Sequence, residues 1–315
     1  TIRAEISERS VDMLPDGNVT IAIDWSSINY KDGLATLPKG GVVREYPRVP
    51  GIDLAGVVKH SSDPRFDEGE RVLVTGFGTG VSHDGGYAQY AKVPGDWVIK
   101  CPENLSLRES MIFGTAGFTA ALAIERLEHQ GIDPESGPVL VTGATGGVGS
   151  IAIMVLSKFG YKVSAVTGKK DKSNYLKELG ASNIIDRKDF EGEPRVLGKG
   201  LWDGVVDTVG GTILSNAISQ TRHSGIVAAC GNAANIKLNT TVMPFIIRGV
   251  KLWGIDSVML SKKRREFIWS QVPNFIDFKL LEKNIKIVNL EELLNIFPSI
   301  LKGEISGRVL VDLNK

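Results

Sequence analysis

A glycine-rich turn between an apolar strand and a helix constrains the fold of this chain more than any other segment. Val139–Val141 has the pattern of a buried strand, and Gly143, Gly146 and Gly149 follow it where a helical segment begins at Val148. Phosphate oxygens need a close approach to backbone N–H groups, which a side chain in the turn would block, and a helix N-terminus adds partial positive charge. Three glycines alone are a weak motif, but a strand before them and a helix after them favour a turn that binds the diphosphate of a dinucleotide.

Strands and helices alternate through the segment that surrounds this turn. A helix is expected over Val148–Phe159, ending at Gly160, and further strands follow it at regular intervals. These strands are expected at Val163–Val166, Gly204–Asp207, Gly225–Cys230 and Lys251–Ile255, with helices at Lys172–Leu179 and in the stretch that ends at Gln220. The alternation predicts a parallel sheet with helices on both faces.

The N-terminal third has a different pattern, with short strands between clusters of turn residues. The strands are expected at Val19–Ile23, Leu54–Val58, Arg71–Thr75 and Tyr87–Val93. They predict a mostly β, barrel-like domain. Ser106–Glu109 has the spacing of a helix capping box, and a second helical segment is expected at Thr119–Leu127. A helix near Leu290–Leu301 and a final strand at Arg308–Leu313 are expected to return to the first domain.

Together these patterns predict an α/β protein, and a length of 315 residues suits about two domains. The barrel-like domain is expected over residues 1–112 and is completed by residues 259–315. The other domain, a doubly wound parallel sheet of the Rossmann type, is expected over residues 113–258.

Charge and cysteine content exclude several classes of protein. A net charge of +1 and a pI near 7.7 argue against a nucleic-acid or anionic-membrane partner, which would require a basic excess. No segment has the run of about 18 apolar residues that spans a bilayer, and the charged first residues do not form a signal peptide. The two cysteines, Cys101 and Cys230, are far apart, which fits a reducing cytoplasm and not a disulfide framework.

The residues after the second strand of the parallel sheet predict which dinucleotide is bound. An NAD site usually has Asp or Glu at this strand end, where the carboxylate accepts a hydrogen bond from the ribose 2′-hydroxyl. This chain has Thr167, Gly168, Lys169 and Lys170 there, and a lysine ammonium suits the 2′-phosphate of NADPH. One charge-assisted hydrogen bond contributes about 1.5–3 kcal/mol, so a contact from Lys169 favours NADPH roughly ten- to a hundredfold.

Neighbouring residues leave alternatives open. Lys169 and Lys170 are alternatively solvated loop lysines, an interpretation that is nearly as good as phosphate recognition for Lys170 and less favoured for Lys169. Asp171 is close enough to supply the missing carboxylate if the strand ends later than expected. Arg187 follows another expected strand and is a candidate for a second phosphate contact.

Several blocks outside the turn are similar to those of one known family. In chain order they are Asn29–Asp32, Val49–Gly56, Asp63–Phe66, Gly114–Ala120, Thr240–Ile246, Gly254–Ser257 and Ser306–Arg308. Over essentially its whole length the chain resembles the acryloyl-CoA reductase branch of the medium-chain dehydrogenases/reductases, whose members are often labelled quinone oxidoreductases. The resemblance implies a GroES-like catalytic barrel, a Rossmann domain, NADPH as cofactor and a homodimer.

The resemblance also implies the residues of the cofactor site. It puts Tyr30 beside the nicotinamide. The diphosphate is expected to be held by Thr142, Gly143, Gly146, Gly147, Val148 and Gly149. The adenosine phosphate is expected to be held by Thr167, Gly168, Lys169 and Arg187. The rest of the cofactor is expected to be lined by Asn232, Ile246 and Ser257. Lys169 stands where the branch commonly has Arg, which keeps the charge and loses the bidentate geometry, and Asn232 stands where an apolar residue is common.

The chain lacks the ligand pattern of the zinc-dependent members of this family. Ile52-Asp53 replaces the His–Glu pair of the zinc motif, no cysteine lies near Asn29 or Tyr30 in the sequence, and the four histidines show no ligand spacing. A site without zinc has no Lewis acid to polarise an alcohol or a carbonyl, so the sequence favours the reduction of a conjugated alkene or a quinone.

The expected reaction is hydride transfer from NADPH to the β-carbon of an activated alkene, such as the short enoyl thioester acryloyl-CoA. Tyr30 is a candidate for a hydrogen-bond donor or proton source, and equally for an aromatic wall packed on the nicotinamide. Asn29 is a candidate for orienting the substrate or the nicotinamide amide. Lys31 and Asp32 are expected to form an ion pair that fixes the loop.

Two basic features and two other functions complete the expectations. Lys262–Arg265 is expected to be a solvated helix start, with the phosphates of coenzyme A as an alternative, and Arg308 either reaches the active site or pairs with a surface acid. An NADPH:quinone reductase needs the same cofactor site with a flat aromatic pocket, and an aromatic content of 7% favours the thioester. A non-catalytic NADPH-binding sensor or structural protein is the third interpretation.

Overall fold

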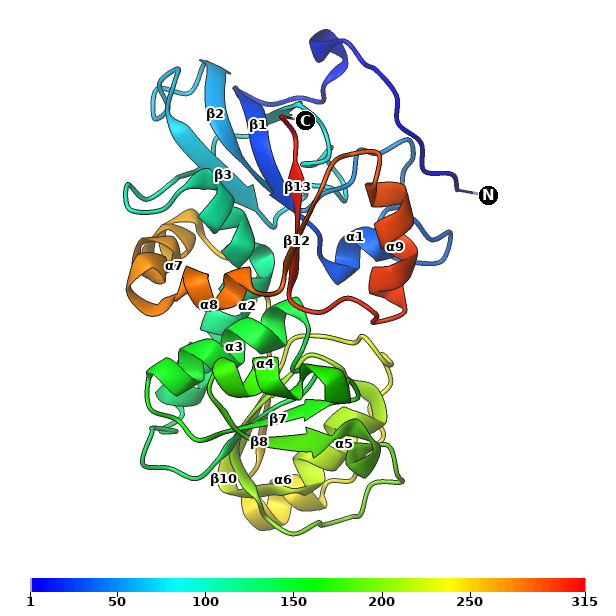
Figure 1. Cartoon of the computed structure of the whole chain (residues 1–315), viewed down its shortest axis with the longest axis vertical. Coiled ribbons are helices and arrows are strands. Elements are labelled where there is room, and N and C mark those ends of the chain that lie inside the picture. The colour runs from blue at the N-terminus through cyan, green and yellow to red at the C-terminus, as the bar shows by residue number, and fades with distance from the viewer. Residues whose placement is uncertain (1, 315) are drawn as a thin grey trace. The chain divides into compact units, whose positions relative to one another are not determined.

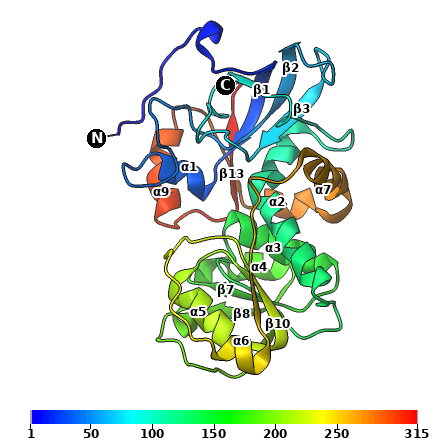
Figure 2. The same cartoon turned by 180° about the vertical axis from the view of Figure 1, so that it is seen from behind.

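The computed structural model describes residues 2–314, and the contacts within the chain divide it into two compact units. The first unit comprises Thr1–Thr115, Ser257–Asn274 and Glu282–Lys315, and the second comprises Ala116–Asp256 and Phe275–Leu281. Figures 1 and 2 show the elements of each unit from opposite sides. Each unit is therefore assembled from segments that are far apart in the sequence.

Within residues 2–314, a sheet of seven strands forms the body of the first unit. Its strands are β1 (Val19–Ser27), β2 (Asp53–Ser61), β3 (Arg71–Thr75), β4 (Tyr90–Val93), β5 (Ile99–Lys100), β12 (Ile285–Val288) and β13 (Arg308–Asp312). Their order is β12-β13-β1-β2-β3-β5, with β4 paired to β1. β1 is antiparallel to β2, β4 and β13, so one long strand joins the N-terminal segments to the C-terminal strand. This pairing confirms the expected return of the tail.

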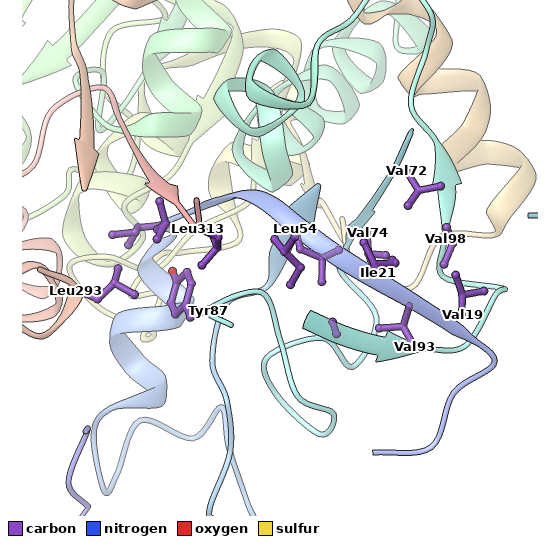
Figure 3. Packing of buried hydrophobic residues seen from close by; sticks show 14 of the residues in the cluster. Val19, Ile21, Leu54, Val72, Val74, Tyr87, Val93, Val98, Leu293 and Leu313 are labelled. Carbon is purple, nitrogen blue, oxygen red and sulfur yellow. The ribbon is translucent and has the colours of Figure 1, made fainter. Parts of the chain in front are cut away.

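Alternating apolar side chains build the core of this sheet. In β1, Val19, Ile21 and Ile23 are buried, while the residues between them are partly exposed, as expected for a strand with one covered face. All three belong to one cluster with side chains of β2 and β3, and Figure 3 shows Val19 and Ile21 there with Leu293 and Leu313 of the tail. Full burial of a side chain of this size contributes about 1.5–3 kcal/mol to the stability of the folded chain. The buried leucines of the tail therefore help to stabilise the first unit.

Two helices from opposite ends of the chain pack together in the first unit. α1 (Tyr30–Ala35) and α9 (Leu293–Leu301) lie side by side in both views (Figures 1 and 2). A Cβ atom on Gly33 of α1 would lie 3.0 Å from Ile300 Cγ2 and from Leu301 Cγ, so a larger residue there would push these side chains away. The sequence pattern does not predict α1, because the helix is short and glycine weakens helices.

The second unit contains a wholly parallel sheet. Its strands are β6 (Val139–Val141), β7 (Val163–Thr167), β8 (Ala181–Asp186), β9 (Trp202–Asp207), β10 (Thr221–Ala229) and β11 (Lys251–Gly254). The helices between them are α3 (Gly147–Lys158), α4 (Ser173–Glu178), α5 (Gly211–Ser219) and α6 (Met243–Arg248). The strand order is β11-β10-β9-β6-β7-β8. This is the predicted doubly wound sheet.

The direction of winding reverses between β6 and β9, which neighbour each other in the sheet. From β6 the chain proceeds to β7 and β8, and from β9 it proceeds the other way to β10 and β11. Loops that leave the carboxyl ends of such a pair of strands diverge and open a crevice, which is where sheets of this kind bind ligands. The glycine turn follows β6, at this position.

The remaining helices include one long interrupted element. α2 (Leu107–His129) begins with the predicted capping box, because Ser106 N donates to Glu109 Oε2 at 2.9 Å and Glu109 N donates to Ser106 Oγ at 3.1 Å. Its helical geometry breaks at Gly114, with φ 50° and ψ −159°. The other elements are α7 (Lys262–Phe275), α8 (Phe278–Glu282) and the 3-10 turns η1 (Val11–Met13), η2 (Lys170–Lys172) and η3 (Arg187–Phe190). Across residues 2–314, none of the helices has both the length and the apolarity needed to cross a bilayer.

Replacement of Phe113 by Ala should destabilise the first unit by about 3–5 kcal/mol, because it leaves a cavity where a fully buried ring meets the edge of Trp269. The free energy of unfolding, measured by urea titration, checks this expectation. Phe267→Ala is the matched control, since Phe267 lies in α7 with 54% of its surface exposed and its loss should cost less than about 1 kcal/mol. Equal losses in the two variants would contradict the packing described here.

Candidate active site

The glycine turn after β6 is shaped by close backbone approaches. Gly143 has φ +59°, and a Cβ atom there would lie 2.1 Å from Thr208 Oγ1. A Cβ atom on Gly149 would lie 2.5 Å from the carbonyl oxygen of Gly143. Gly146 N donates to that same oxygen at 2.9 Å, which closes the turn. A larger residue at position 149 would therefore displace backbone atoms, and one at position 143 would displace the Thr208 side chain and strain the backbone at positive φ.

The first turn of α3 has the features of an anion site. Its N-cap is Gly146, which has no side chain to accept hydrogen bonds from the first helical amides, and no acidic residue stands in that turn. The first amides of a helix have no partner within the helix, and the helix dipole makes this end partly positive. The geometry therefore suits a phosphate group at Gly147 and Val148.

A buried carboxylate holds the turn to the neighbouring strands. Asp207, at the end of β9, accepts hydrogen bonds from Thr142 Oγ1 at 2.6 Å and from Gly210 N at 2.8 Å. Burial raises the pKa of Asp207 above its ordinary value, and these hydrogen bonds oppose the rise. Thr142 Oγ1 also accepts from Thr208 N at 3.1 Å. The Thr142 hydroxyl is thus already engaged within the protein, and its contribution is to fix the turn.

The loop after β10 packs on the loop after β9. A Cβ atom on Gly231 would lie 2.2 Å from the carbonyl oxygen of Thr208, and one on Gly210 would lie 3.3 Å from the Cα atom of Asn232. The structure therefore brings the turn at Thr142 and the loop at Asn232 to the same edge of the sheet. Ile246 lies on α6, with 67% of its surface exposed.

The end of β7 holds the residues expected to choose between the two dinucleotides. The strand ends at Thr167, and Lys169 N donates to Thr167 Oγ1 at 3.0 Å. A Cβ atom on Gly168 would lie 3.1 Å from Arg187 Cζ, so the guanidinium lies against the glycine. The strand ends one residue later than expected, at Thr167 instead of Val166, and Asp171 still lies beyond it, in the turn η2.

In the first unit, Asn29 is held at both ends of its side-chain amide. Its Nδ2 donates to Asp53 Oδ2 at 2.8 Å, and its Oδ1 accepts from Arg308 Nη1 at 3.4 Å. Tyr30, the next residue, is the first of α1 and is partly buried. An amide engaged in this way is a fixed part of the loop, and it sets the position at which Tyr30 begins.

Asp53 and Arg308 form a buried pair beneath this loop. Arg308 Nη2 lies 3.9 Å from Asp53 Oδ2 and donates to Ser27 Oγ at 2.8 Å, while Arg308 Nε donates to the carbonyl oxygen of Ile112 at 2.9 Å. Asp53 also accepts hydrogen bonds from Ser27 Oγ and from Thr115 N. The expectation that Arg308 pairs with a surface acid was wrong, because Arg308 is 3% exposed and its partner Asp53 is buried. That Arg308 reaches the active site stays a prediction.

Asp32 is buried as well, and it fixes the loop through the backbone. Its carboxylate accepts from Asn29 N at 2.8 Å and from Ile52 N at 3.0 Å, so these contacts do the work that the sequence assigned to a pair with Lys31. Burial raises the pKa of Asp32 to about 7, and the charge of Asp53 adds to the rise, against the hydrogen bonds it accepts. A carboxyl group in this state exchanges its proton near neutral pH.

Ile52 and Asp53 occupy the place of the zinc motif that the sequence analysis identified. Ile52 is buried, and the Asp53 oxygens are engaged by protein donors, as described above. Within residues 2–314, no group of three or more His, Cys, Asp or Glu side chains is arranged to hold a metal ion.

The basic run Lys262–Arg265 is not uniformly solvated, contrary to expectation. Arg265 is fully buried and donates to the carbonyl oxygen of Ser257 at 2.8 Å, which fixes this predicted cofactor residue within the first unit. Lys262 Nζ lies 4.6 Å from the centre of the Phe66 ring, at the wall of a pocket of about 690 Å³. Part of the run therefore serves the packing of the first unit.

Both cysteines are free thiols, and Cys101 is buried while Cys230 is partly buried. Cys230 Sγ donates to the carbonyl oxygen of Asp207 at 3.2 Å, and burial raises its pKa to about 12. Cys101 Sγ donates to the carbonyl oxygen of Leu105 at 3.3 Å, and burial raises its pKa to about 11. This agrees with the interpretation of Cys101 as part of the core.

The fold and the glycine turn together define a two-domain dehydrogenase. The family model described as "Alcohol dehydrogenase GroES-like domain" matches residues 15–103, and the model described as "Zinc-binding dehydrogenase" matches residues 147–275. With the relatives given below, these matches show that the chain belongs to the medium-chain dehydrogenase/reductase family. The resemblance drawn from the sequence is confirmed, and the chain is an oxidoreductase.

Several relatives cover nearly the whole chain. Acrylyl-CoA reductase AcuI of Ruegeria pomeroyi is 46% identical over 99% of this chain and 95% of its own length. "Putative quinone oxidoreductase YhfP" of Bacillus subtilis is 48% identical over 99% of this chain and 95% of its own. The YhdH oxidoreductase of Salmonella enterica, solved in complex with NADP, has a TM-score of 0.96 at 45% identity, over 99% of this chain and 96% of its own. YhfP, solved with NAD bound, has a TM-score of 0.92 at 48% identity, over 97% of this chain and 93% of its own.

Sequence reasoning missed Asp207, Thr208 and the buried pair of Asp53 and Arg308. Asp207 had one available signal, since an acid that directly follows the buried run Gly204–Val206 must find donors nearby. The pair of Asp53 and Arg308 had no such signal, because its members are far apart in the chain and only the assembled sheet brings them together.

Asp32→Asn should gain stability relative to the wild type as the pH rises. Asp32 ionises near 3.8 in the unfolded chain and near 7 in the folded one, so folding takes up a proton between these values. Between these pH values, Asp32 lowers the free energy of unfolding of the wild type by about 1.4 kcal/mol for each unit that the pH rises. Asn cannot ionise, so the variant does not lose stability in this way. Urea unfolding at a series of pH values measures the difference.

Asp16→Asn, which removes an exposed carboxyl group from the same unit, controls for the loss of a surface charge. A difference between Asp32→Asn and the wild type that does not change with pH would contradict the raised pKa of Asp32.

Proposed function

We propose that this protein uses NADPH to reduce an activated alkene, with a short enoyl thioester such as acryloyl-CoA as substrate. The observation that carries the proposal is 46% identity with an acrylyl-CoA reductase over 99% of the chain. The glycine turn and the lysine-bearing end of β7 support the choice of cofactor. The catalytic domain is assigned to residues 1–112 with 259–315, and the cofactor domain to residues 113–258.

The second unit has the shape that the cofactor requires. The turn at Gly143 and Gly149 has no space for a Cβ atom, and the first amides of α3 are directed at the diphosphate. Gly146, Gly147 and Val148 bind this group through the backbone. Thr142 fixes the turn through Asp207 and Thr208. Thr167, Gly168, Lys169 and Arg187 bind the adenosine phosphate. Asn232 and Ile246 of this unit, with Ser257 of the first unit, line the remainder of the cofactor.

The chemistry divides between the cofactor and the first unit. Bound NADPH supplies a hydride to the β-carbon of the alkene. Tyr30 presents its phenol group to the reacting carbons and donates a hydrogen bond or a proton there. Asn29 positions Tyr30, because Asp53 and Arg308 hold its amide at both ends. The site works without zinc, since the oxygens of Asp53 are engaged by protein donors.

Reduction of a quinone is the second candidate function. The observation in its favour is the 48% identity with YhfP, which carries a quinone oxidoreductase name. A protein that binds NADPH without turning it over is the third candidate.

One assay separates these functions: the loss of NADPH absorbance with acryloyl-CoA, with an aromatic quinone, and with buffer alone. We expect the largest kcat/KM with acryloyl-CoA, and a lower rate for Tyr30→Phe, which keeps the ring and loses the hydroxyl. A higher kcat/KM with the quinone would reverse the ranking. No turnover with either acceptor, together with tight NADPH binding, would favour the non-catalytic protein.

The assembly proposed for the protein is a homodimer in the cytoplasm. β11 lies at the edge of the parallel sheet with all four residues exposed, including Leu252 and Trp253, and an exposed apolar edge strand is a surface that another strand can pair with. The free thiols of both cysteines suit a reducing compartment.

Leu252→Glu should therefore lower the molar mass in solution from that of a dimer to that of a monomer, measured by light scattering after size exclusion. Leu294→Glu is the control, because Leu294 is 39% exposed and Leu252 is 37% exposed. A wild-type protein that elutes as a monomer would refute the dimer.

A further inference from the structure

A carboxylate stands beside the proposed site for the adenosine phosphate. Thr167 and Asp186 are Cα partners across the parallel ladder of β7 and β8, and each is the last residue of its strand. A carboxylate at this edge repels a phosphate group and suits the 2′-hydroxyl of a cofactor that lacks the phosphate. The chain therefore places Asp186 where its charge opposes the binding of NADPH.

Asp186 has a structural task that explains its presence. Its Oδ1 accepts from Lys188 N at 3.0 Å and so caps the turn η3, whose first residue is Arg187. Arg187 Nε donates to Glu191 Oε1 at 2.7 Å, and the Arg187 guanidinium lies against Gly168. The acceptor at position 186 thus helps to set the position of Arg187.

Lys170 lies against this carboxylate. Its Nζ is 2.9 Å from Asp186 Oδ2, and the two side chains are 79% and 26% exposed. The hydrogen bond from Lys188 and that from Lys170 lower the pKa of Asp186, so the carboxylate is ionised at neutral pH and its charge has to be balanced. Lys170 is thus paired with Asp186, although most of its side chain is exposed to solvent.

We propose that Lys170 determines cofactor specificity by masking Asp186, so that Lys169 and Arg187 attract the 2′-phosphate of NADPH. The inference rests on the proposed function and specifies how its cofactor site is tuned. Family membership does not fix this choice, because YhdH is solved with NADP and YhfP with NAD at 45% and 48% identity to this chain.

The test compares the dissociation constants of NADPH and NADH for Lys170→Met, Asp186→Asn and the double variant. Met keeps most of the length of the lysine side chain and loses its charge, and Asn keeps the oxygen that caps η3. For Lys170→Met we expect the Kd of NADPH to rise roughly tenfold, which corresponds to about 1.4 kcal/mol, with the Kd of NADH unchanged or lower. The double variant should return to within about twofold of the wild type, since Asp186→Asn removes the charge that Lys170 masks.

Lys172→Met, in the same turn η2, is the matched control and should leave both constants unchanged. An unchanged ratio of the two constants in Lys170→Met would overturn the proposal. A tenfold loss that Asp186→Asn does not repair would also overturn it, because Lys170 would then contact the phosphate directly.

Failure of the proposed function is recognised separately, from the wild type and Lys169→Ala. A wild-type protein that binds NADH as tightly as NADPH refutes the phosphate site itself, and with it the role of Lys170. If the wild type prefers NADPH, Lys169→Ala should reduce that preference. A Lys169→Ala variant that keeps it in full removes Lys169 from the site, and the role of Lys170 is then decided by its own variants.

Discussion

The carboxylate of Asp207 is the contact on which the cofactor edge of the second unit depends. This carboxylate accepts hydrogen bonds from Thr142, which follows β6, and from Gly210, which follows β9. The backbone carbonyl oxygen of Asp207 accepts a hydrogen bond from Cys230, which follows β10. Three loops meet in this way, and glycines stand at several of the points where they approach most closely. The arrangement leaves main-chain N–H groups as the donors available to an anion, which is why the turn suits a diphosphate whatever group lies beyond it.

In the first unit, a buried pair of charged side chains fixes the loop that leads to Tyr30. The pair of Asp53 and Arg308 is buried, and a buried pair is tolerated only where hydrogen bonds satisfy both partners. Here Ser27, Thr115 and backbone carbonyl groups supply those bonds, and the side-chain amide of Asn29 joins the two charges. The C-terminal strand thus provides a cation that contacts Asn29, next to Tyr30, in a loop formed near the start of the chain.

The sequence predicted what depends on local pattern. Period and turn residues located the parallel strands and the glycine turn, and the residues after Val166 pointed to the adenosine phosphate. The class of protein followed from long blocks of similar residues. What the sequence could not show were contacts made across the sheet, such as Asp53 with Arg308 or Lys170 with Asp186, because periodicity carries no information on which distant residues meet. Short elements such as α1 were missed because packing against α9 stabilises them more than helix propensity does. The domain limits and the assigned site residues stay predictions.

The two thiols have a consequence for a protein that handles electrophilic alkenes. Such alkenes add readily to thiolates, and the thiolate, not the thiol, is the nucleophile. With pKa values of about 11 and about 12, Cys101 and Cys230 remain almost wholly protonated at neutral pH. Their raised pKa values therefore protect the protein from alkylation by the class of molecule proposed as its substrate.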